Sequence, residues 1–212
     1  MLTLHAWPTP NGQKIFIMLE ELGEPHEIRF VNISKNEQFD PEFLKIAPNN
    51  KIPALVDDEA EGGPLALFES GAILHYLADK YGRFLAPSGH SRWHAVQWLH
   101  WQMGGLGPML GQLGYFGLRA EEKVPQAIAR FTEEAARLIG VLDKRLGEAR
   151  YLGGEDFSIA DIATFPWARG AASFFTTLLA EPIGKAANLA RWLDEVGNRP
   201  AVQRAMAIKP PA

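Results

Sequence analysis

The stretch NNKIPALV, residues 49–56, sets a proline directly before a short apolar run. Proline cannot donate a hydrogen bond within a sheet, and it restricts the preceding Ile52 to extended geometry, so the stretch predicts a buried strand that starts just after Pro53. A cis Ile52–Pro53 bond would present the backbone N–H and C=O of Ile52 to an extended ligand. A plain strand-initiating proline is the alternative, and the rarity of cis bonds favours it.

The segments around this proline alternate between strand and helix patterns. Strand periodicity with bounding turn residues marks strands, and apolar spacing of three to four residues marks helices. The expected strands are Leu2–Ala6, His26–Val31, Ala54–Asp57 and Leu65–Phe68, and the expected helices run from Asn11 to the stop signal at Gly23, around Pro41–Ile46, and over Glu69–Tyr81. This order predicts an α/β unit with a small mixed sheet.

Beyond Tyr81 the strand signals disappear. Residues 81–91 contain Gly82, Pro87, Ser88 and Gly89 and form the candidate linker. The expected helices cover residues 92–115, 125–146, 158–168 and 184–196, with a short one after Pro200. The sequence therefore predicts two domains, an α/β domain over residues 1–81 and an all-helical domain over residues 90–212.

The composition limits the kinds of function. The chain has 212 residues with a formal net charge of -4 and a pI of about 5.9, so no overall basic field draws it to nucleic acid or to an anionic membrane. It contains no cysteine, which excludes disulfides and zinc–thiolate sites, and any thiol chemistry must use the thiol of a ligand. No secretory signal and no apolar run of membrane-spanning length is evident, so we expect a cytoplasmic protein.

Three segments are candidates for chemistry. The first, Thr9-Pro10-Asn11-Gly12, lies where a strand gives way to a helix, and a helix start favours an anion through its unpaired N–H groups and dipole. Thr9 and Asn11 add a hydroxyl and an amide that can donate hydrogen bonds. A simple helix cap is the alternative, and on local sequence alone it is favoured.

The other two candidates are the Ile52–Pro53 segment and Glu69-Ser70. Ser70 is a natural N-cap of the helix that follows it, and its backbone N–H can also receive a ligand carboxylate. Glu69 can receive a ligand ammonium, although a plain cap explains this pair equally well. Each candidate lies beside a strand end of one small sheet, where ligands tend to bind. This shared position favours a binding role for all three segments.

Two other patterns are read as structural. His90 and His94 have the spacing of metal ligands on a helix, but no carboxylate motif accompanies them. Phe157-Ser158-Ile159-Ala160-Asp161-Ile162 is typical of an N-cap with a returning acidic side chain and a hydrophobic staple.

These motifs in their order resemble the cytosolic glutathione transferase superfamily over nearly the whole chain. The segments TPNGQKIFIMLEELG, FDPEFLKIAPNNKIPALVD, LFESGAILHYLA and WQMGGLGPMLGQ are most similar to its nu class. The resemblance implies a thioredoxin-like N-terminal domain followed by an all-α C-terminal domain. It implies a glutathione-dependent disulfide-bond oxidoreductase, with organic hydroperoxide reduction as a secondary activity and glutathione, reduced or oxidised, as cosubstrate. It also implies a homodimer, small-molecule thiol, disulfide or peroxide substrates, and no metal.

The resemblance also implies the site residues. Tyrosine-type transferases place a catalytic tyrosine where this chain has Trp7, and cysteine-type branches need a cysteine that it lacks. Thr9 and Asn11 then lie near the glutathione sulfur. The implied glutathione-binding residues are Gln38, Lys51, Ile52, Pro53, Glu69 and Ser70, with Arg130 reaching the ligand of a neighbouring subunit.

Two other functions stay open. A conjugating transferase would use an apolar second site, for which Met103, Met109, Tyr115 and Phe116 are candidates, although such a stripe is more often core. A non-catalytic glutathione-binding regulatory protein on the same fold is the other, because fold does not determine function.

Overall fold

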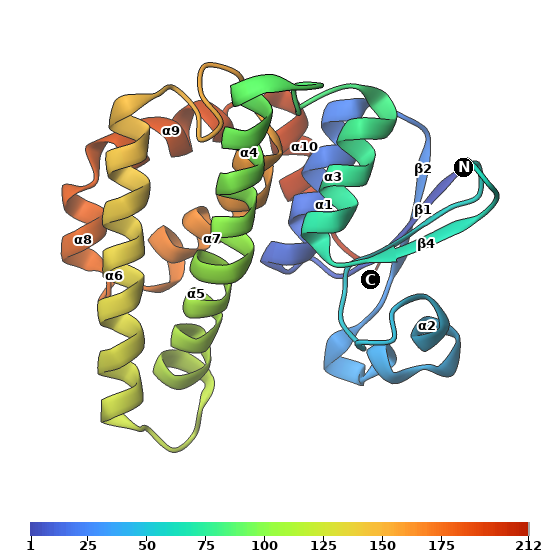
Figure 1. Cartoon of the computed structure of the whole chain (residues 1–212). Coiled ribbons are helices and arrows are strands. Elements are labelled where there is room, and N and C mark those ends of the chain that lie inside the picture. Colours follow the sequence, from blue (N-terminus) through green and yellow to red (C-terminus); the bar gives the residue numbers. More distant parts are fainter. Residues whose placement is uncertain (212) are drawn as a thin grey trace. The chain divides into compact units, whose positions relative to one another are not determined.

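The computed structural model describes residues 1–211, which group into two compact units (Figure 1). The first unit joins Met1–Arg83 with the segment from Asn198 onward, and the second is Phe84–Gly197. The contacts thus place the C-terminal segment with the first unit rather than with the helices that precede it. The domain limits of 1–81 and 90–212 stay a prediction.

The first unit is built on a four-stranded mixed sheet. Its strands are β1 (Leu2–Ala6), β2 (His26–Phe30), β3 (Ala54–Asp57) and β4 (Leu65–Phe68), in the order β2-β1-β3-β4. β1 runs parallel to β2 and antiparallel to β3, and β3 and β4 form an antiparallel pair. The predicted small mixed sheet is confirmed.

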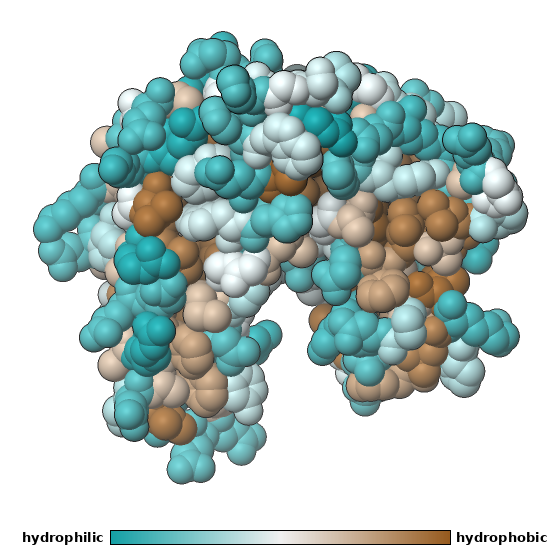
Figure 2. Space-filling view, viewed as in Figure 1, coloured by the Kyte–Doolittle hydropathy of each residue, from teal (hydrophilic) through white to brown (hydrophobic). Residues whose placement is uncertain are grey.

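Helices cover both faces of this sheet. α1 (Pro10–Leu22) and α3 (Ser70–Tyr81) pack against each other on one side, and the short α2 (Pro41–Ile46) lies on the other (Figure 1). The 3-10 turns Ile33–Lys35 and Glu37–Phe39 lead into α2. Figure 2 shows hydrophobic residues gathered at the surface where Figure 1 draws β4, and Phe68 at the end of that strand is 39% exposed.

α10 (Pro200–Ala207) packs along α1. Arg199 just before it donates to both carboxylate oxygens of Glu21, at 2.6 and 2.9 Å, and Arg204 donates to Glu20 at 2.7 Å. These pairs and the buried Val202 and Ala205 of α10 hold the C-terminal segment on the first unit.

The second unit consists of helices. They are α4 (Gly89–Trp101), α5 (Gly107–Leu113), α6 (Pro125–Glu148), α7 (Ile159–Phe174), α8 (Ala180–Lys185) and α9 (Ala187–Gly197), with π-helical turns at Gln102–Leu106 and Gly114–Arg119. The single helix predicted over residues 92–115 is thus wrong in its interior. The first π turn lies just before Pro108, which has no N–H to continue an α-helical ladder.

The predicted cap before α7 is confirmed. Asp161 Oδ2 accepts from the backbone N–H and hydroxyl of Ser158, at 3.1 and 2.9 Å, and Asp161 Oδ1 accepts from Leu152 N–H at 3.0 Å and Trp192 Nε1 at 2.9 Å. The carboxyl is fully buried, and burial raises its pKa against the lowering effect of these bonds. It fixes the start of α7 and ties α7 to α9.

Candidate functional site

The strand register brings the three predicted site segments to one edge of the sheet. His5 of β1 pairs with Ala54 of β3, and Ala54 pairs with Phe68 of β4. The C-terminal end of β1, the N-terminal end of β3 and the C-terminal end of β4 therefore meet. Thr9, Pro53 and Ser70 lie within a few residues of these ends, so segments far apart in sequence converge.

Thr9 forms the junction between β1 and α1. It is the N-cap of α1, with its hydroxyl accepting from Gly12 N–H at 3.4 Å, and its own N–H donates to the Trp7 carbonyl at 2.7 Å. The predicted capping role is therefore present. Asn11 follows in the first turn and, like Thr9, is partly buried.

Gly12 lets this turn approach the end of β1. A Cβ at Gly12 would lie 2.0 Å from the Trp7 carbonyl oxygen, so no larger residue fits without movement of the backbone. The Trp7 side chain turns to Phe30 in an edge-on contact with ring centroids 6.1 Å apart. The position expected of a catalytic tyrosine thus holds a packed indole.

The Ile52–Pro53 peptide bond is cis, so the trans geometry that base rates favour is wrong here. Pro53 is buried at the start of β3. Ile52 packs against a cluster between α2 and the sheet that comprises Val31, Phe43, Ala47 and Ala54, with Ile46 beside it. Its backbone is held at the edge where β1 and β4 also end.

Glu69 and Ser70 differ from the predicted cap. Glu69, with a φ of 72°, is the residue before the helix, and its side chain makes no capping bond, while Ser70 is already helical. Glu69 is exposed and Ser70 is only 3% exposed. The expectation that Ser70 caps α3 is wrong because its hydroxyl instead faces Lys14, whose Nζ donates to Ser70 Oγ at 3.3 Å.

Lys14 is the site-proximal residue that the sequence reading missed. It is 1% exposed, and burial lowers its pKa to about 7, with the nearby Glu69 carboxylate acting in the opposite direction. The sequence does contain a signal for the burial of this lysine. Lys14, Met18 and Leu22 recur at intervals of four residues and lie on one buried face of α1. A lysine on such a stripe indicates a buried amine.

The remaining predicted residues are less closely tied to this edge. Gln38 lies in the turn before α2 and is partly buried, and its Oε1 is buried without a hydrogen-bond partner within residues 1–211. Lys51 is exposed next to Ile52. Arg130 is exposed on α6 of the second unit, and its role toward a neighbouring subunit stays a prediction.

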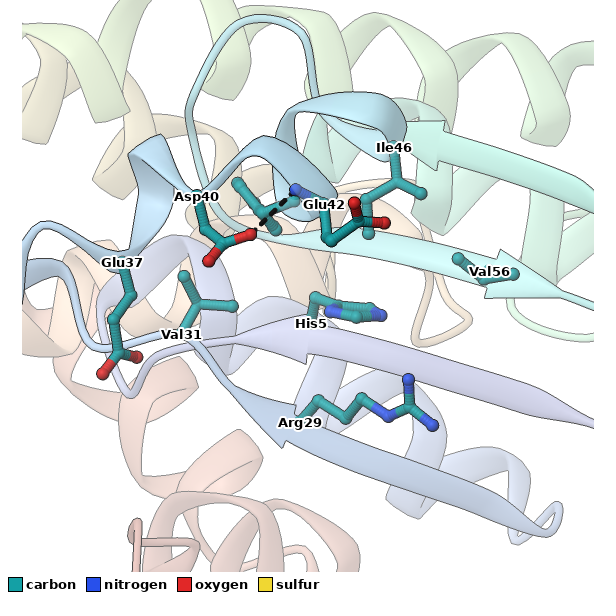
Figure 3. A pocket seen from close by; sticks show the side chains of 9 residues that line it. His5, Arg29, Val31, Glu37, Asp40, Glu42, Ile46 and Val56 are labelled. Carbon is teal, nitrogen blue, oxygen red and sulfur yellow. Dashed lines mark hydrogen bonds between the residues drawn. The ribbon is translucent and has the colours of Figure 1, made fainter.

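A separate pocket of about 460 Å³ opens on the α2 side of the sheet (Figure 3). His5 and Val56 point into it from the strands, and Arg29, Asp40 and Glu42 lie at its rim (Figure 3). Burial and the positive Arg29 lower the pKa of His5. Because Thr9 and Ser70 do not line it, this pocket is not the predicted site.

Residues 1–211 hold no group of three His, Cys, Asp or Glu side chains placed to bind a metal ion. The rings of His90 and His94 stack at 6.4 Å between centroids. Within the same residues, no helix is both long and apolar enough to cross a membrane.

The chain folds into two compact units, and its three predicted site segments converge at one edge of the sheet in the first unit. Two family models match, the glutathione S-transferase N-terminal domain over residues 9–80 and the glutathione S-transferase C-terminal domain over residues 125–195. The chain belongs to the glutathione S-transferase family, and it is an enzyme of that family that depends on glutathione.

Two bacterial relatives make the comparison more specific. The disulfide-bond oxidoreductase YfcG of Escherichia coli is 48% identical over 97% of this chain and 94% of its own length. The disulfide-bond oxidoreductase YghU of the same organism is 40% identical over 98% of this chain and 74% of its own length.

Solved structures agree with this fold over nearly the whole chain. A glutathione transferase family member from Pseudomonas fluorescens, with two glutathione bound, has a TM-score of 0.93 and 48% identity, covering 97% of this chain and 92% of that one. A glutathione transferase from Pseudomonas putida, with one glutathione disulfide bound per subunit, has a TM-score of 0.93 and 42% identity, covering 99% and 92%.

Proposed function

We propose that this chain is a glutathione-dependent disulfide-bond oxidoreductase that activates a bound thiol without a tyrosine or cysteine of its own. The observation that carries the proposal is the convergence of Thr9, Ile52–Pro53 and Glu69-Ser70 at one sheet edge in a chain without cysteine. The names of the two Escherichia coli relatives support the reaction class.

The start of α1 supplies the thiol-activating field. A free thiol has a pKa of about 8.5, and lowering it to about 6.5 needs roughly 2.7 kcal/mol of preferential thiolate stabilisation. One helix terminus contributes about 0.3–2 kcal/mol, depending on burial. Charge-assisted hydrogen bonds from the Thr9 hydroxyl and the Asn11 amide supply the remainder. Neither residue becomes a nucleophile.

The reaction then proceeds by two thiol–disulfide exchanges. The bound glutathione thiolate attacks one sulfur of the substrate disulfide, a new S–S bond forms, and the departing substrate thiolate takes a proton from water. A second glutathione thiolate attacks the glutathione sulfur of the mixed disulfide and releases the other substrate thiol. One substrate disulfide is reduced to two thiols, and two glutathione molecules are oxidised to one glutathione disulfide.

The proposed cradle assigns one part of glutathione to each segment. The backbone of Ile52, before Pro53, pairs with the cysteinyl residue of glutathione. Glu69 receives the γ-glutamyl ammonium and Ser70 the γ-glutamyl carboxylate, at the start of a twelve-residue helix whose N–H groups favour an anion. Gln38 and Lys51 contact the remaining polar groups. The glutathione pair and glutathione disulfide in the two Pseudomonas structures support a site with room for either.

Two further parts of the proposal concern assembly and setting. Arg130 reaches the ligand of the second subunit in a homodimer, and a solution mass twice the 23.5 kDa of one chain is the expected result. The cytoplasm, where glutathione keeps thiols reduced, is the compartment that fits a reductase of this kind.

Organic hydroperoxide reduction is the secondary activity, since the same thiolate can attack a peroxide oxygen. A conjugating transferase is the second candidate. In the second unit Tyr115 packs edge-on against Phe116, which stacks on Phe131, and Tyr115 is 51% exposed; this partly exposed aromatic cluster supports that candidate.

The test measures kcat/KM with glutathione and bis(2-hydroxyethyl) disulfide, an organic hydroperoxide and an aryl halide. Thr9→Ala and Asn11→Ala are each expected to lose about 10- to 100-fold with the disulfide, the size of a lost charge-assisted hydrogen bond. Thr9→Ser keeps the hydroxyl and is expected to retain most activity. Thr132→Ala on α6, where the hydroxyl has no hydrogen-bond partner within residues 1–211, is the matched control.

Unchanged kcat/KM in both alanine variants would displace the proposed centre. Faster turnover of the aryl halide than of the disulfide would favour the conjugating transferase. Absence of turnover with all three substrates would favour a non-catalytic glutathione-binding protein.

A further inference from the structure

Lys14 is a buried amine directly behind the proposed γ-glutamyl site. Its side chain is 1% exposed in the interior of the first unit, and its Nζ lies 3.3 Å from Ser70 Oγ. Glu69, one residue earlier, is close enough to act on it electrostatically. The amine thus contacts the hydroxyl that is the candidate for carboxylate binding, and the candidate ammonium-binding carboxylate acts on it through its charge.

The other charged groups on the elements around α1 are engaged elsewhere. From α10, Arg204 pairs with Glu20 and Arg199 with Glu21. On α3 and β3, Lys80 pairs with Asp57, Tyr76 donates to Asp57, His75 lies 3.7 Å from Asp79, and Arg83 donates to the Leu22 carbonyl. His5 of β1 faces the α2 pocket. The carboxylate of Glu69 is the one whose charge acts on the Lys14 amine and raises its pKa.

We infer that Lys14 is a positioning residue for the carboxylate of the γ-glutamyl group, and that binding of this carboxylate draws a proton onto Lys14. The inference rests on the proposed glutathione site. A lysine ammonium is a donor only, so the Ser70 oxygen must accept from it. In the complex the Ser70 hydroxyl then donates its proton to the ligand carboxylate.

The sign of the proton transfer follows from the geometry. The ligand carboxylate on Ser70 is separated from Lys14 by a single hydroxyl, whereas the ligand ammonium lies beyond the Glu69 carboxylate. The nearer, negative group dominates, and it favours the charged form of Lys14. Binding therefore takes up a proton from solution.

The lowered pKa of Lys14 places this linkage near neutral pH. With a pKa of about 7 in the free protein, the amine is about half protonated at neutrality. A bound carboxylate raises that pKa, so the ligand binds the protonated form more tightly. Affinity is full below the free pKa and falls as the pH rises above it.

Calorimetry of the full chain with S-methylglutathione tests this, because that ligand has no thiol to titrate. Titrations in two buffers of different ionisation enthalpy count the protons exchanged. We expect uptake of about half a proton near neutral pH and a Kd that rises about 10-fold between about pH 6 and pH 8. Lys14→Met is expected to bind more weakly, with no uptake and a flat pH dependence. Lys144→Met, an exposed lysine on α6, is the control and is expected to behave as wild type.

A second measurement does not depend on the variant folding. In the wild-type chain with isotope-labelled lysine, one side chain should titrate near neutral pH and move to higher pH when S-methylglutathione is bound. Binding without proton uptake, uptake retained in Lys14→Met, or proton release would each overturn the role of Lys14 and leave the proposed function standing. Failure of S-methylglutathione and of glutathione to bind at all would overturn both.

Discussion

Gly12→Ala is expected to disable the site far more than it destabilises the chain. A Cβ at this position would lie 2.0 Å from the Trp7 carbonyl oxygen, a backbone atom that no rotamer change can move. An ordinary carbon–oxygen contact is about 3.3 Å or longer, so the first turn of α1 and the end of β1 must separate by more than about 1 Å. Thr9 and Asn11 belong to the part that moves.

The expected loss of stability in Gly12→Ala is much smaller than the expected loss of activity. Strain of this kind lowers the free energy of unfolding by about 1–3 kcal/mol, and the better helix propensity of alanine returns up to ~1 kcal/mol. The net loss of about 1–2 kcal/mol leaves a typical chain folded at room temperature. Misplacement of catalytic groups by about 1 Å costs on the order of 100-fold in rate. We therefore expect kcat/KM to fall about 100-fold.

The assay pairs urea unfolding with kcat/KM for glutathione and bis(2-hydroxyethyl) disulfide. Gly140→Ala is the matched control, because a Cβ there has no heavy atom within 4 Å and the residue lies inside α6. It should raise the free energy of unfolding by about 0.5–1 kcal/mol and leave turnover unchanged. A Gly12→Ala variant with wild-type stability and kcat/KM within about twofold of wild type would show that α1 is not held against Trp7 as described.

Two further predictions concern buried carboxylates. Asp161→Ala leaves the indole N–H of Trp192 and the N–H of Ser158 without their acceptor. We therefore expect the free energy of unfolding to fall by about 3–5 kcal/mol. A decrease below about 1 kcal/mol in urea unfolding would contradict this. Burial raises the pKa of Asp57, but the bond from Lys80 and its other donors outweigh burial and lower it. The stability contributed by Asp57 is therefore present above its unfolded pKa of about 3.8 and is lost as the pH falls through the folded value. Lys80→Met should move the acid-unfolding midpoint to higher pH. An unchanged midpoint would show that the Lys80–Asp57 pair does not stabilise the folded chain in acid.

The strands were predictable because turn-forming residues lie at their ends. Leu2–Ala6, Ala54–Asp57 and Leu65–Phe68 occur as expected, since prolines and glycines flank these short apolar runs and leave little freedom in where pairing begins. The helix expected from Arg92 was not predictable in its interior. Apolar spacing reports which face is buried, but it does not distinguish α-helical from π-helical hydrogen bonding over a few residues.

The convergence of the three candidate segments was predictable from the strand ends, whereas the directions of their side chains were much less so. Pairing of His5 with Ala54 and of Ala54 with Phe68 brings three segments together, and each segment carries a local signal of its own. The direction of a side chain carries no such signal. The sequence equally allows the Ser70 hydroxyl to cap its own helix or to turn inward.

The contact with Lys14 explains why the Ser70 hydroxyl turns inward. Because the Lys14 amine is buried, it needs a hydrogen-bond acceptor nearby, and Ser70 Oγ lies 3.3 Å away. With its oxygen accepting from Lys14, Ser70 lies inside the first turn of α3, and the start of that helix has no side-chain cap from Glu69 before it. A residue that local sequence predicts to be a cap is thus held inward by a lysine on the buried face of a different helix.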